Sequence, residues 1–220
     1  MINEGDFIEI EYTGFIEEDN EVFDTTSEKI ARDAGIYSEN GIYGSIGICV
    51  GQGYVLKGLE KQLVGKDLNK EVKIKVKTDD AFGKKDGKLL KLIASQKFVK
   101  QGVKPFPGLR VNIDNLIGVI RTVTGGRTIV DFNHPLAGKD LLYDVKIKDL
   151  VKDTKEKLNW ILKMSLGIND AEITVNEKTA RIKLKNKIPD EIQQKIGDKV
   201  KEIIKEITEI KFDWSDKFIY

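Results

Sequence analysis

Strict alternation of apolar and polar residues marks the strands predicted in the first half of the chain. Residues 7–13 place Ile8, Ile10 and Tyr12 on one face, and Phe7 with two glutamates on the other. This two-residue period is typical of a half-buried β-strand. The same alternation, or a short apolar run, predicts further strands at residues 22–24, 45–51, 71–77 and 141–147.

A short amphipathic helix is predicted from Tyr54 to the position before Gly65. Gly51 and Gly53 precede it and free the backbone for a tight turn, and Gly65 stands where a helix C-cap belongs. Strands on either side bury little surface alone, so we expect this helix to lie against a curved sheet. Its first turn then forms a pocket floor. The apolar residues at helical spacing are Val55, Leu56, Leu59 and Leu63.

The segments between these elements differ in character. Residues 28–44 carry turn-forming residues and two tyrosines, which predicts an ordered surface loop. Residues 84–88 (KKDGK) are polar and indicate a hinge. Residues 89–131 are rich in Leu, Ile, Val and Phe and read as short strands joined by turns. Since the strand at 141–147 resumes the earlier alternation, residues 89–131 are predicted to be an insertion.

A second architecture begins after Val151. A helix starts at Asp153 and ends at Gly167, and two alternating segments then form a hairpin. Pro189 opens another helix, whose apolar stripe runs to Ile207, and residues 209–214 make a final strand. This unit can expose part of its sheet or stripe, so a homodimer through the C-terminal domain is one expectation.

The predicted fold class is α+β. An antiparallel half-barrel sheet wraps on the short helix, with an inserted small β-rich domain and a C-terminal α-β-β-α-β domain. The predicted domains are residues 1–88 with 132–152, residues 89–131, and residues 153–220.

Composition excludes several classes of partner. The net charge is +1, and lysines alternate with glutamates without an aromatic-basic platform, so nucleic acid is not an expected partner. No segment approaches the ~20 apolar residues of a membrane span, so no membrane association is expected. The acidic N-terminus lacks the pattern of a signal peptide. We therefore expect a cytoplasmic location.

Covalent and metal chemistry also find little support. Cys49 is the only cysteine and lies in an apolar run, which favours a buried, inert thiol. His134 is the only histidine and stands beside Pro135 in a turn, so neither a metal site nor a Ser-His-Asp triad is indicated. The segment from Gly51 matches no phosphate-binding or dinucleotide-binding motif. No cofactor and no metal are expected.

Five segments together resemble the FKBP-type peptidyl-prolyl isomerases. The interruption between DAFG and NHPLAG also resembles the insert-in-flap chaperone domain of the bacterial SlyD type and its long archaeal relatives. The resemblance covers residues 1–150, and the remainder matches only the additional C-terminal domain of long archaeal members. The segments are YTG at 12–14, VFDTT at 22–26, VGQGYVLKGLE at 50–60, DAFG at 80–83 and LLYDV at 141–145.

The resemblance implies a pocket of aromatic and aliphatic side chains that binds X-Pro segments. Locally, Asp24 serves equally well as a cap of the turn at Thr25, but the resemblance favours the pocket. Ile46 and Leu59 replace common aromatic residues, Phe82 replaces a common tyrosine, and the Leu56 amide is offered to a substrate carbonyl. The implied site residues are Tyr12, Phe23, Asp24, Ile46, Val55, Leu56, Leu59, Phe82 and Tyr143.

The implied function is a peptidyl-prolyl cis/trans isomerase that also binds unfolded polypeptides as a folding chaperone. Two alternatives stay open: a catalytically weak holdase, and a dimeric scaffold organised by the C-terminal domain. The insertion is expected to hold unfolded chains through exposed apolar side chains. The candidates are Leu89, Leu92, Ile93, Phe98 and Phe106.

Overall fold

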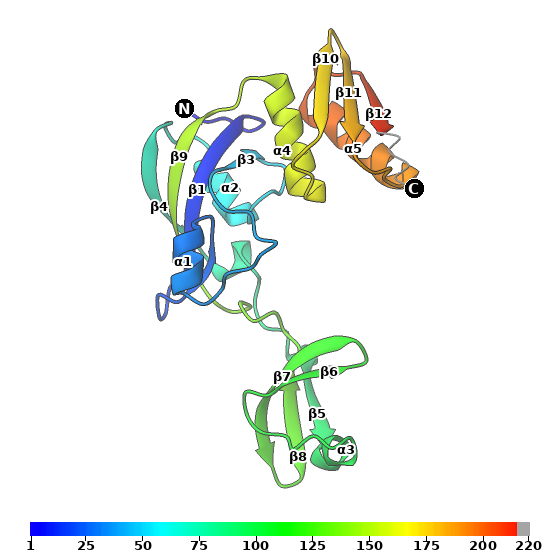
Figure 1. Cartoon of the computed structure of the whole chain (residues 1–220). Coiled ribbons are helices and arrows are strands. Elements are labelled where there is room, and N and C mark those ends of the chain that lie inside the picture. The colour runs from blue at the N-terminus through cyan, green and yellow to red at the C-terminus, as the bar shows by residue number, and fades with distance from the viewer. Residues whose placement is uncertain (215–220) are drawn as a thin grey trace. The chain divides into compact units, whose positions relative to one another are not determined.

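The structure is a computed structural model that describes residues 1–214 (Figure 1). The chain divides into two compact units, one formed by Met1–Val76 with the chain from Leu142 onward, and the other by Lys77–Leu141. Residues 215–220, the end of the predicted C-terminal domain, lie outside the described residues.

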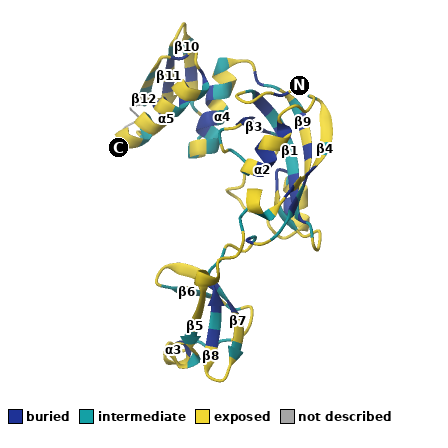
Figure 2. Ribbon diagram, turned by 180° about the vertical axis from the view of Figure 1, so that it is seen from behind, coloured by how far each residue is buried: buried dark blue, intermediate teal, exposed yellow. Residues whose placement is uncertain are grey.

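A five-stranded sheet around one short helix forms the body of the first unit. The strand order is β2-β1-β9-β4, and β3 pairs with β1. Helix α2 buries Leu59 and Leu63 among buried strand residues such as Ile8 and Ile74, as the dark colouring around α2 shows (Figure 2). The expected α+β class with antiparallel pairing is therefore confirmed. The elements are β1 (Phe7–Ile16), β2 (Val22–Thr25), β3 (Ile46–Cys49), α2 (Lys57–Leu63), β4 (Lys70–Val76) and β9 (Leu141–Leu150).

Two local predictions differ from the structure. Helix α2 begins at Lys57 and not at Tyr54, because the carboxylate of Glu60 holds the preceding backbone as a turn. The predicted loop at 28–44 contains the helix α1 (Glu28–Asp33). The Ser27 side chain caps this helix by accepting from the Ile30 amide, and Glu28 pairs with Arg32 at 2.7 Å.

The second unit is a small antiparallel sheet of order β5-β8-β7-β6 with one helix. Its core consists of Phe98, Ile120 and Val130 with half-buried neighbours. Residues 85–86 are hydrogen-bonded or ion-paired to residues 131–133, so the predicted hinge is tied to a neighbouring segment within this unit. The elements are β5 (Leu90–Ala94), α3 (Ser95–Lys100), β6 (Arg110–Ile113), β7 (Leu116–Thr124) and β8 (Arg127–Asp131), with 3-10 turns at Thr78–Asp80 and Gly87–Leu89.

The C-terminal part of the first unit packs two helices on one face of a three-stranded sheet. Asp153 caps α4, and Gly167 ends it in the left-handed conformation at φ 68°, as the sequence predicts. The other face of the sheet carries ion pairs such as Lys183–Glu172 at 3.2 Å. The elements are α4 (Thr154–Leu166), β10 (Glu172–Asn176), β11 (Thr179–Leu184), α5 (Asp190–Ile203) and β12 (Glu209–Trp214).

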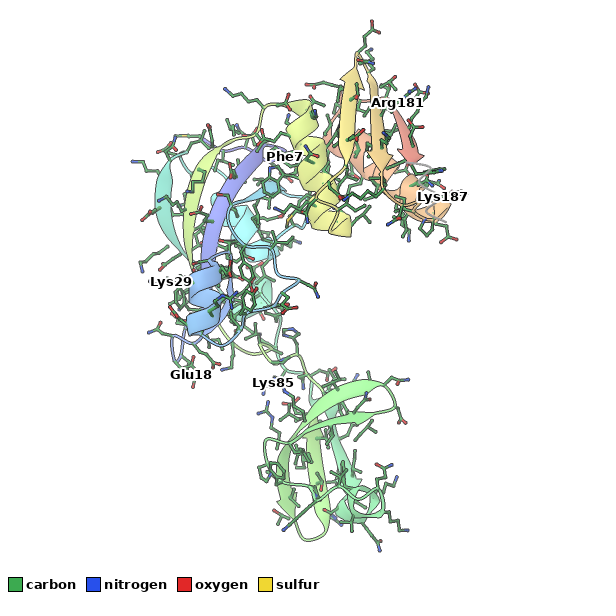
Figure 3. All side chains as sticks on the ribbon, in the orientation of Figure 1. Phe7, Glu18, Lys29, Lys85, Arg181 and Lys187 are labelled. Carbon is green, nitrogen blue, oxygen red and sulfur yellow. The ribbon has the colours of Figure 1, made fainter. Side chains whose placement is uncertain are left out.

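The core of this C-terminal part continues into the first sheet. Phe7 and Cys49, at the ends of the paired strands β1 and β3, belong to the same buried cluster as Leu158 and Leu162 of α4. Figure 3 labels Phe7 at the start of β1, near α4. The position of Phe7 on the polar side of the predicted strand is thus explained by a second layer of structure on that side.

Candidate active site

Three aromatic rings from three strands form one cluster, and two of them lie over Gly14. Tyr12 lies on β1, Phe23 on β2 and Tyr143 on β9. A Cβ atom on Gly14 would lie only 2.8 Å from Phe23 Cζ and 3.0 Å from Tyr143 Cε1. The rings can therefore approach β1 because this position has no side chain.

The rings pack edge to face, and a hydrogen-bonded polar pair lies beside them. The centroids of Tyr12 and Tyr143 are 5.8 Å apart, and those of Phe23 and Tyr143 are 5.7 Å apart. The Tyr12 hydroxyl donates a 2.8 Å hydrogen bond to Oδ2 of Asp24, whose residue is exposed. The cluster thus presents apolar ring surface beside an oriented phenol and a carboxylate.

Both phenols of the cluster stay protonated over the physiological range. Burial is the main cause that raises the pKa of Tyr12, and the charge and hydrogen bond of Asp24 raise it further. Burial and the charge of Asp24 also raise the pKa of Tyr143. The local dipoles are therefore fixed and do not titrate near neutral pH.

A buried glutamate fixes the turn that leads into α2. Glu60 is 4% exposed, and its carboxylate accepts hydrogen bonds from the backbone amides of the turn. The donors are Gly51 (3.1 Å), Gly53 (3.1 Å), Tyr54 (2.8 Å) and Val55 (3.3 Å). Glu60 was not predicted from the sequence to be a functional residue. The available signal was a single acidic residue on the buried side of a short apolar helix, where an acid is rare unless it is paired.

The expected pocket floor divides into buried and partly exposed residues. Ile46 and Leu59 are 3% and 0% exposed, and Tyr143 of the aromatic cluster is 3% exposed, so these side chains offer almost no surface to a ligand. Val55 and Leu56, next to the turn held by Glu60, are half-buried and retain surface that a ligand can contact.

Phe82 belongs to the compact unit Lys77–Leu141. Its ring stacks on His134 with centroids 4.2 Å apart and an interplanar angle of 4°. Nδ1 of His134 accepts a hydrogen bond from the Leu136 amide at 3.2 Å, which holds the imidazole in place. The role of Phe82 in the pocket stays a prediction.

The apolar residues of segment 89–131 that were expected to be exposed divide into three groups. Leu89, Leu92 and Phe106 are exposed, at 38%, 60% and 55%. Ile93 is half-buried against the small core. The expectation is wrong for Phe98, which is 5% exposed, because the helix α3 turns this ring into the core of the small sheet. Four exposed apolar residues were not predicted: Leu90, Val99, Leu116 and Ile117.

A separate cleft of about 790 Å³ lies against the same sheet. Tyr12 is among its lining residues, but Phe23, Asp24 and Tyr143 are not. Side chains alternate across a strand, so Glu11 and Lys146, which also line it, point to the face opposite the aromatic cluster. The cleft and the aromatic cluster therefore share Tyr12 but differ in their other residues.

Residues 1–214 contain neither a metal-binding cluster nor a membrane-spanning helix. No group of three or more His, Cys, Asp or Glu side chains in this range is arranged to hold a metal ion. No helix in the same range is long and apolar enough to cross a membrane.

Comparison with known proteins identifies similar chains. The family model described as "FKBP26, IF domain" matches residues 91–136. The short-type peptidyl-prolyl cis-trans isomerase of Methanocaldococcus jannaschii is 29% identical over 150 residues, which cover 68% of this chain and 94% of that protein. A probable FKBP-type 16 kDa peptidyl-prolyl cis-trans isomerase of Pseudomonas fluorescens is 32% identical over 106 residues, or 46% of this chain and 69% of the relative.

The chain belongs to the FKBP-type peptidyl-prolyl cis-trans isomerases. The FKBP-type isomerase SlyD of Pasteurella multocida is also similar, with 31% identity over 113 residues that cover 49% of this chain and 56% of SlyD. The resemblance drawn from the five sequence segments, including its SlyD-like character, is confirmed. The expected enzyme class is confirmed with it.

Proposed function

We propose that this FKBP-type chain catalyses cis/trans isomerisation of X-Pro bonds at the cluster of Tyr12, Phe23, Asp24 and Tyr143. The observation that carries the proposal is the contact of Tyr143 with both Tyr12 and Phe23, beside the Tyr12–Asp24 hydrogen bond. Ile46 and Leu59 support this surface, and Val55 and Leu56 form its floor.

The chemistry requires no bond to break. Rotation about a peptide bond faces a barrier of about 18–20 kcal/mol from amide resonance, and X-Pro bonds exchange spontaneously in tens to hundreds of seconds. A catalyst lowers the barrier by binding the twisted amide better than the planar one. A dry aromatic wall removes the water that stabilises the planar, more polar amide.

The fixed polar groups complete the mechanism. The proline ring packs on Phe23, which Tyr143 supports from the core, and on the floor at Val55, and the Leu56 amide donates to the carbonyl before the proline. Glu60 holds the backbone just before Leu56, so this donor is oriented before the substrate arrives. The Tyr12–Asp24 pair supplies a fixed dipole and charge beside the rotating bond.

Exchange NMR on an X-Pro tetrapeptide with the full chain tests this proposal. Tyr12→Ala and Asp24→Ala should each lower kcat/KM by about tenfold or more, as loss of a positioned polar group does. Lys73→Ala, on the outer face of the sheet and paired with Asp144 at 3.1 Å, is the control and should retain full activity. Wild-type rates in both site variants would remove the site assignment.

A second function is favoured by the exposed apolar side chains of the compact unit Lys77–Leu141. We propose that residues 89–131 are an inserted domain that binds unfolded polypeptides and raises their concentration near the isomerase site. This small unit leaves Leu92, Phe106 and Ile117 exposed at 60%, 55% and 71%. Such apolar surface on a small unit is typical of an interaction site.

The chaperone proposal predicts different effects of one variant on a short peptide and on an unfolded protein. Leu92→Ser with Ile117→Ser should leave turnover of the tetrapeptide unchanged but weaken both refolding catalysis and aggregation suppression of an unfolded client several-fold. Lys97→Ser, also exposed in this unit, is the matched control. Equal behaviour of the double variant and the control on the unfolded client would refute this function.

A homodimer through the C-terminal domain stays a prediction. The outer face of its sheet carries ion pairs, so this face offers no apolar patch for a second copy of the chain. Light scattering of the full chain measures the oligomeric state directly.

A further inference from the structure

The C-terminal part of the first unit contacts the strand that carries Ile46. The indole of Trp160 in α4 lies directly on Gly47 of β3, where an added Cβ atom would be 2.3 Å from both Cδ1 and Cγ of the ring. Gly47 faces Glu9 in the pairing of β3 with β1. The absence of a side chain at Gly47 therefore lets α4 approach the backbone next to a proposed site residue.

A second contact reaches the turn before the pocket floor. Tyr54 packs against the cluster that contains Phe7, Cys49 and the C-terminal core. The ammonium group of Lys199 in α5 lies 4.2 Å from the centroid of the Tyr54 ring. The Tyr54 hydroxyl is buried beside the Ser165 side chain of α4, and within residues 1–214 it makes no hydrogen bond of ordinary geometry. Packing of the ring, and not its hydroxyl, is thus the feature that this contact uses.

Tyr54 is held from two directions. Its backbone amide donates to Glu60 of α2, while its ring lies among side chains of the C-terminal part. The next two residues, Val55 and Leu56, form the proposed floor. A shift of the Tyr54 ring is therefore transmitted through one or two peptide units to the groups that receive the proline.

We propose that the C-terminal α-β-β-α-β unit sets the geometry of the isomerase site, with Trp160 and Tyr54 as positioning residues. Trp160 fixes β3 beside Ile46, and Tyr54 fixes the turn before Val55 and Leu56. Misplacement of a binding group by about 1 Å can cost about 10²-fold in rate, so a loosened contact has a measurable effect. The inference rests on the proposed function, because it concerns the same site.

The test uses steady-state exchange kinetics of the full chain on an X-Pro tetrapeptide. Trp160→Ala should lower kcat/KM about tenfold, mainly through a higher KM, because the floor contacts the proline ring in both ground and transition states. Trp160→Phe should recover at least half of the loss. Tyr54→Ala should behave like Trp160→Ala, whereas Tyr54→Phe should behave like wild type.

A matched variant separates positioning from stability. Ile182→Ala creates a cavity at the centre of the C-terminal sheet, where Ile182 is fully buried. Ile182→Ala should lower the Tm, as Trp160→Ala does. It should leave KM unchanged, because a smaller folded fraction lowers only the apparent kcat. The backbone amide shifts of Ile46, Val55 and Leu56 should move in Trp160→Ala and not in Ile182→Ala.

The outcomes are distinguishable. An unchanged KM together with unchanged shifts at Val55 and Leu56 in folded Trp160→Ala would overturn the inference. Equal KM changes in Ile182→Ala would also overturn it, because the effect would then follow stability alone. A wild-type chain without turnover would refute the proposed function, while the amide shifts would still test whether the C-terminal unit positions the floor.

Discussion

Replacement of Glu60 by glutamine tests whether the turn before α2 is pre-organised by one carboxylate. Glu60 accepts from four backbone amides at 2.8–3.3 Å. Glutamine keeps one carbonyl oxygen and turns an amide group toward the remaining donors, so about half of these bonds are lost. The amides of Tyr54 and Val55 belong to half-buried residues, whereas Gly51 and Gly53 are exposed and can rebind water.

The expected magnitude follows from the two half-buried donors, which both donate to Oε1, the position that the glutamine carbonyl can keep. A hydrogen bond to a charged group contributes about 1.5–3 kcal/mol and one to a neutral group about 0.5–1.5 kcal/mol, so Glu60→Gln should lower the free energy of opening this turn by about 2 kcal/mol. Since about 1.4 kcal/mol is a factor of ten, hydrogen exchange at the Tyr54 and Val55 amides should accelerate about 30-fold. Peptide turnover should fall as well, because the floor is no longer fixed.

Amide hydrogen exchange followed by NMR measures this directly. The control is Glu71→Gln, the same substitution at an exposed glutamate paired with Lys146 at 3.1 Å, which should cost less than about 1 kcal/mol. Unchanged exchange at Tyr54 and Val55 in Glu60→Gln would refute the reasoning. Equal acceleration in Glu71→Gln would show that the effect is not local.

Three further changes probe the packing and the charges. Gly14→Ala adds a Cβ atom 2.8 Å from Phe23, so it should cost about 2 kcal/mol in urea unfolding and lower peptide turnover; wild-type turnover would show that the rings need no space there. Phe98→Ala should cost about 3–5 kcal/mol and remove the NMR signals of Lys77–Leu141 while those of β1 remain, and dispersed signals from both units would contradict it. Burial alone would raise the pKa of Asp131, but hydrogen bonds from Asn133, Arg121 and Lys85 lower it to about 2. Because the folded pKa is below the unfolded one, about 2 kcal/mol of stability should be lost as the pH falls from about 5 to 2 in acid unfolding, and Asp131→Asn should remove this loss.

Local sequence signals predicted the elements that depend on local physics. Alternation located β1, β4 and β9, and Asp153 with Gly167 set both ends of α4. The helix α1 was missed because six residues give too short a period to read, and its Ser27 cap was the available signal. The start of α2 was placed too early because the period of its apolar residues does not show that Glu60 holds the preceding turn.

The site depended on information that periodicity does not contain. Tyr12, Phe23 and Tyr143 converge because β1 lies between β2 and β9, a long-range pairing that the resemblance supplied and the alternation did not. The sequence placed Phe7 on a polar face, because Glu9 and Glu11, which share that face of the strand, are charged. Its burial by the C-terminal unit is a tertiary effect between segments that are more than a hundred residues apart.

The central claim is that the aromatic cluster catalyses X-Pro isomerisation, and exchange NMR of an X-Pro tetrapeptide with catalytic amounts of the full chain tests it most directly. The cis/trans exchange should be at least about 100-fold faster than the spontaneous process, which takes tens to hundreds of seconds. Bound peptide should shift the resonances of Leu56 and Tyr143. A spontaneous rate, or shifts confined to the outer cleft at Glu71 and Lys146, would contradict the claim.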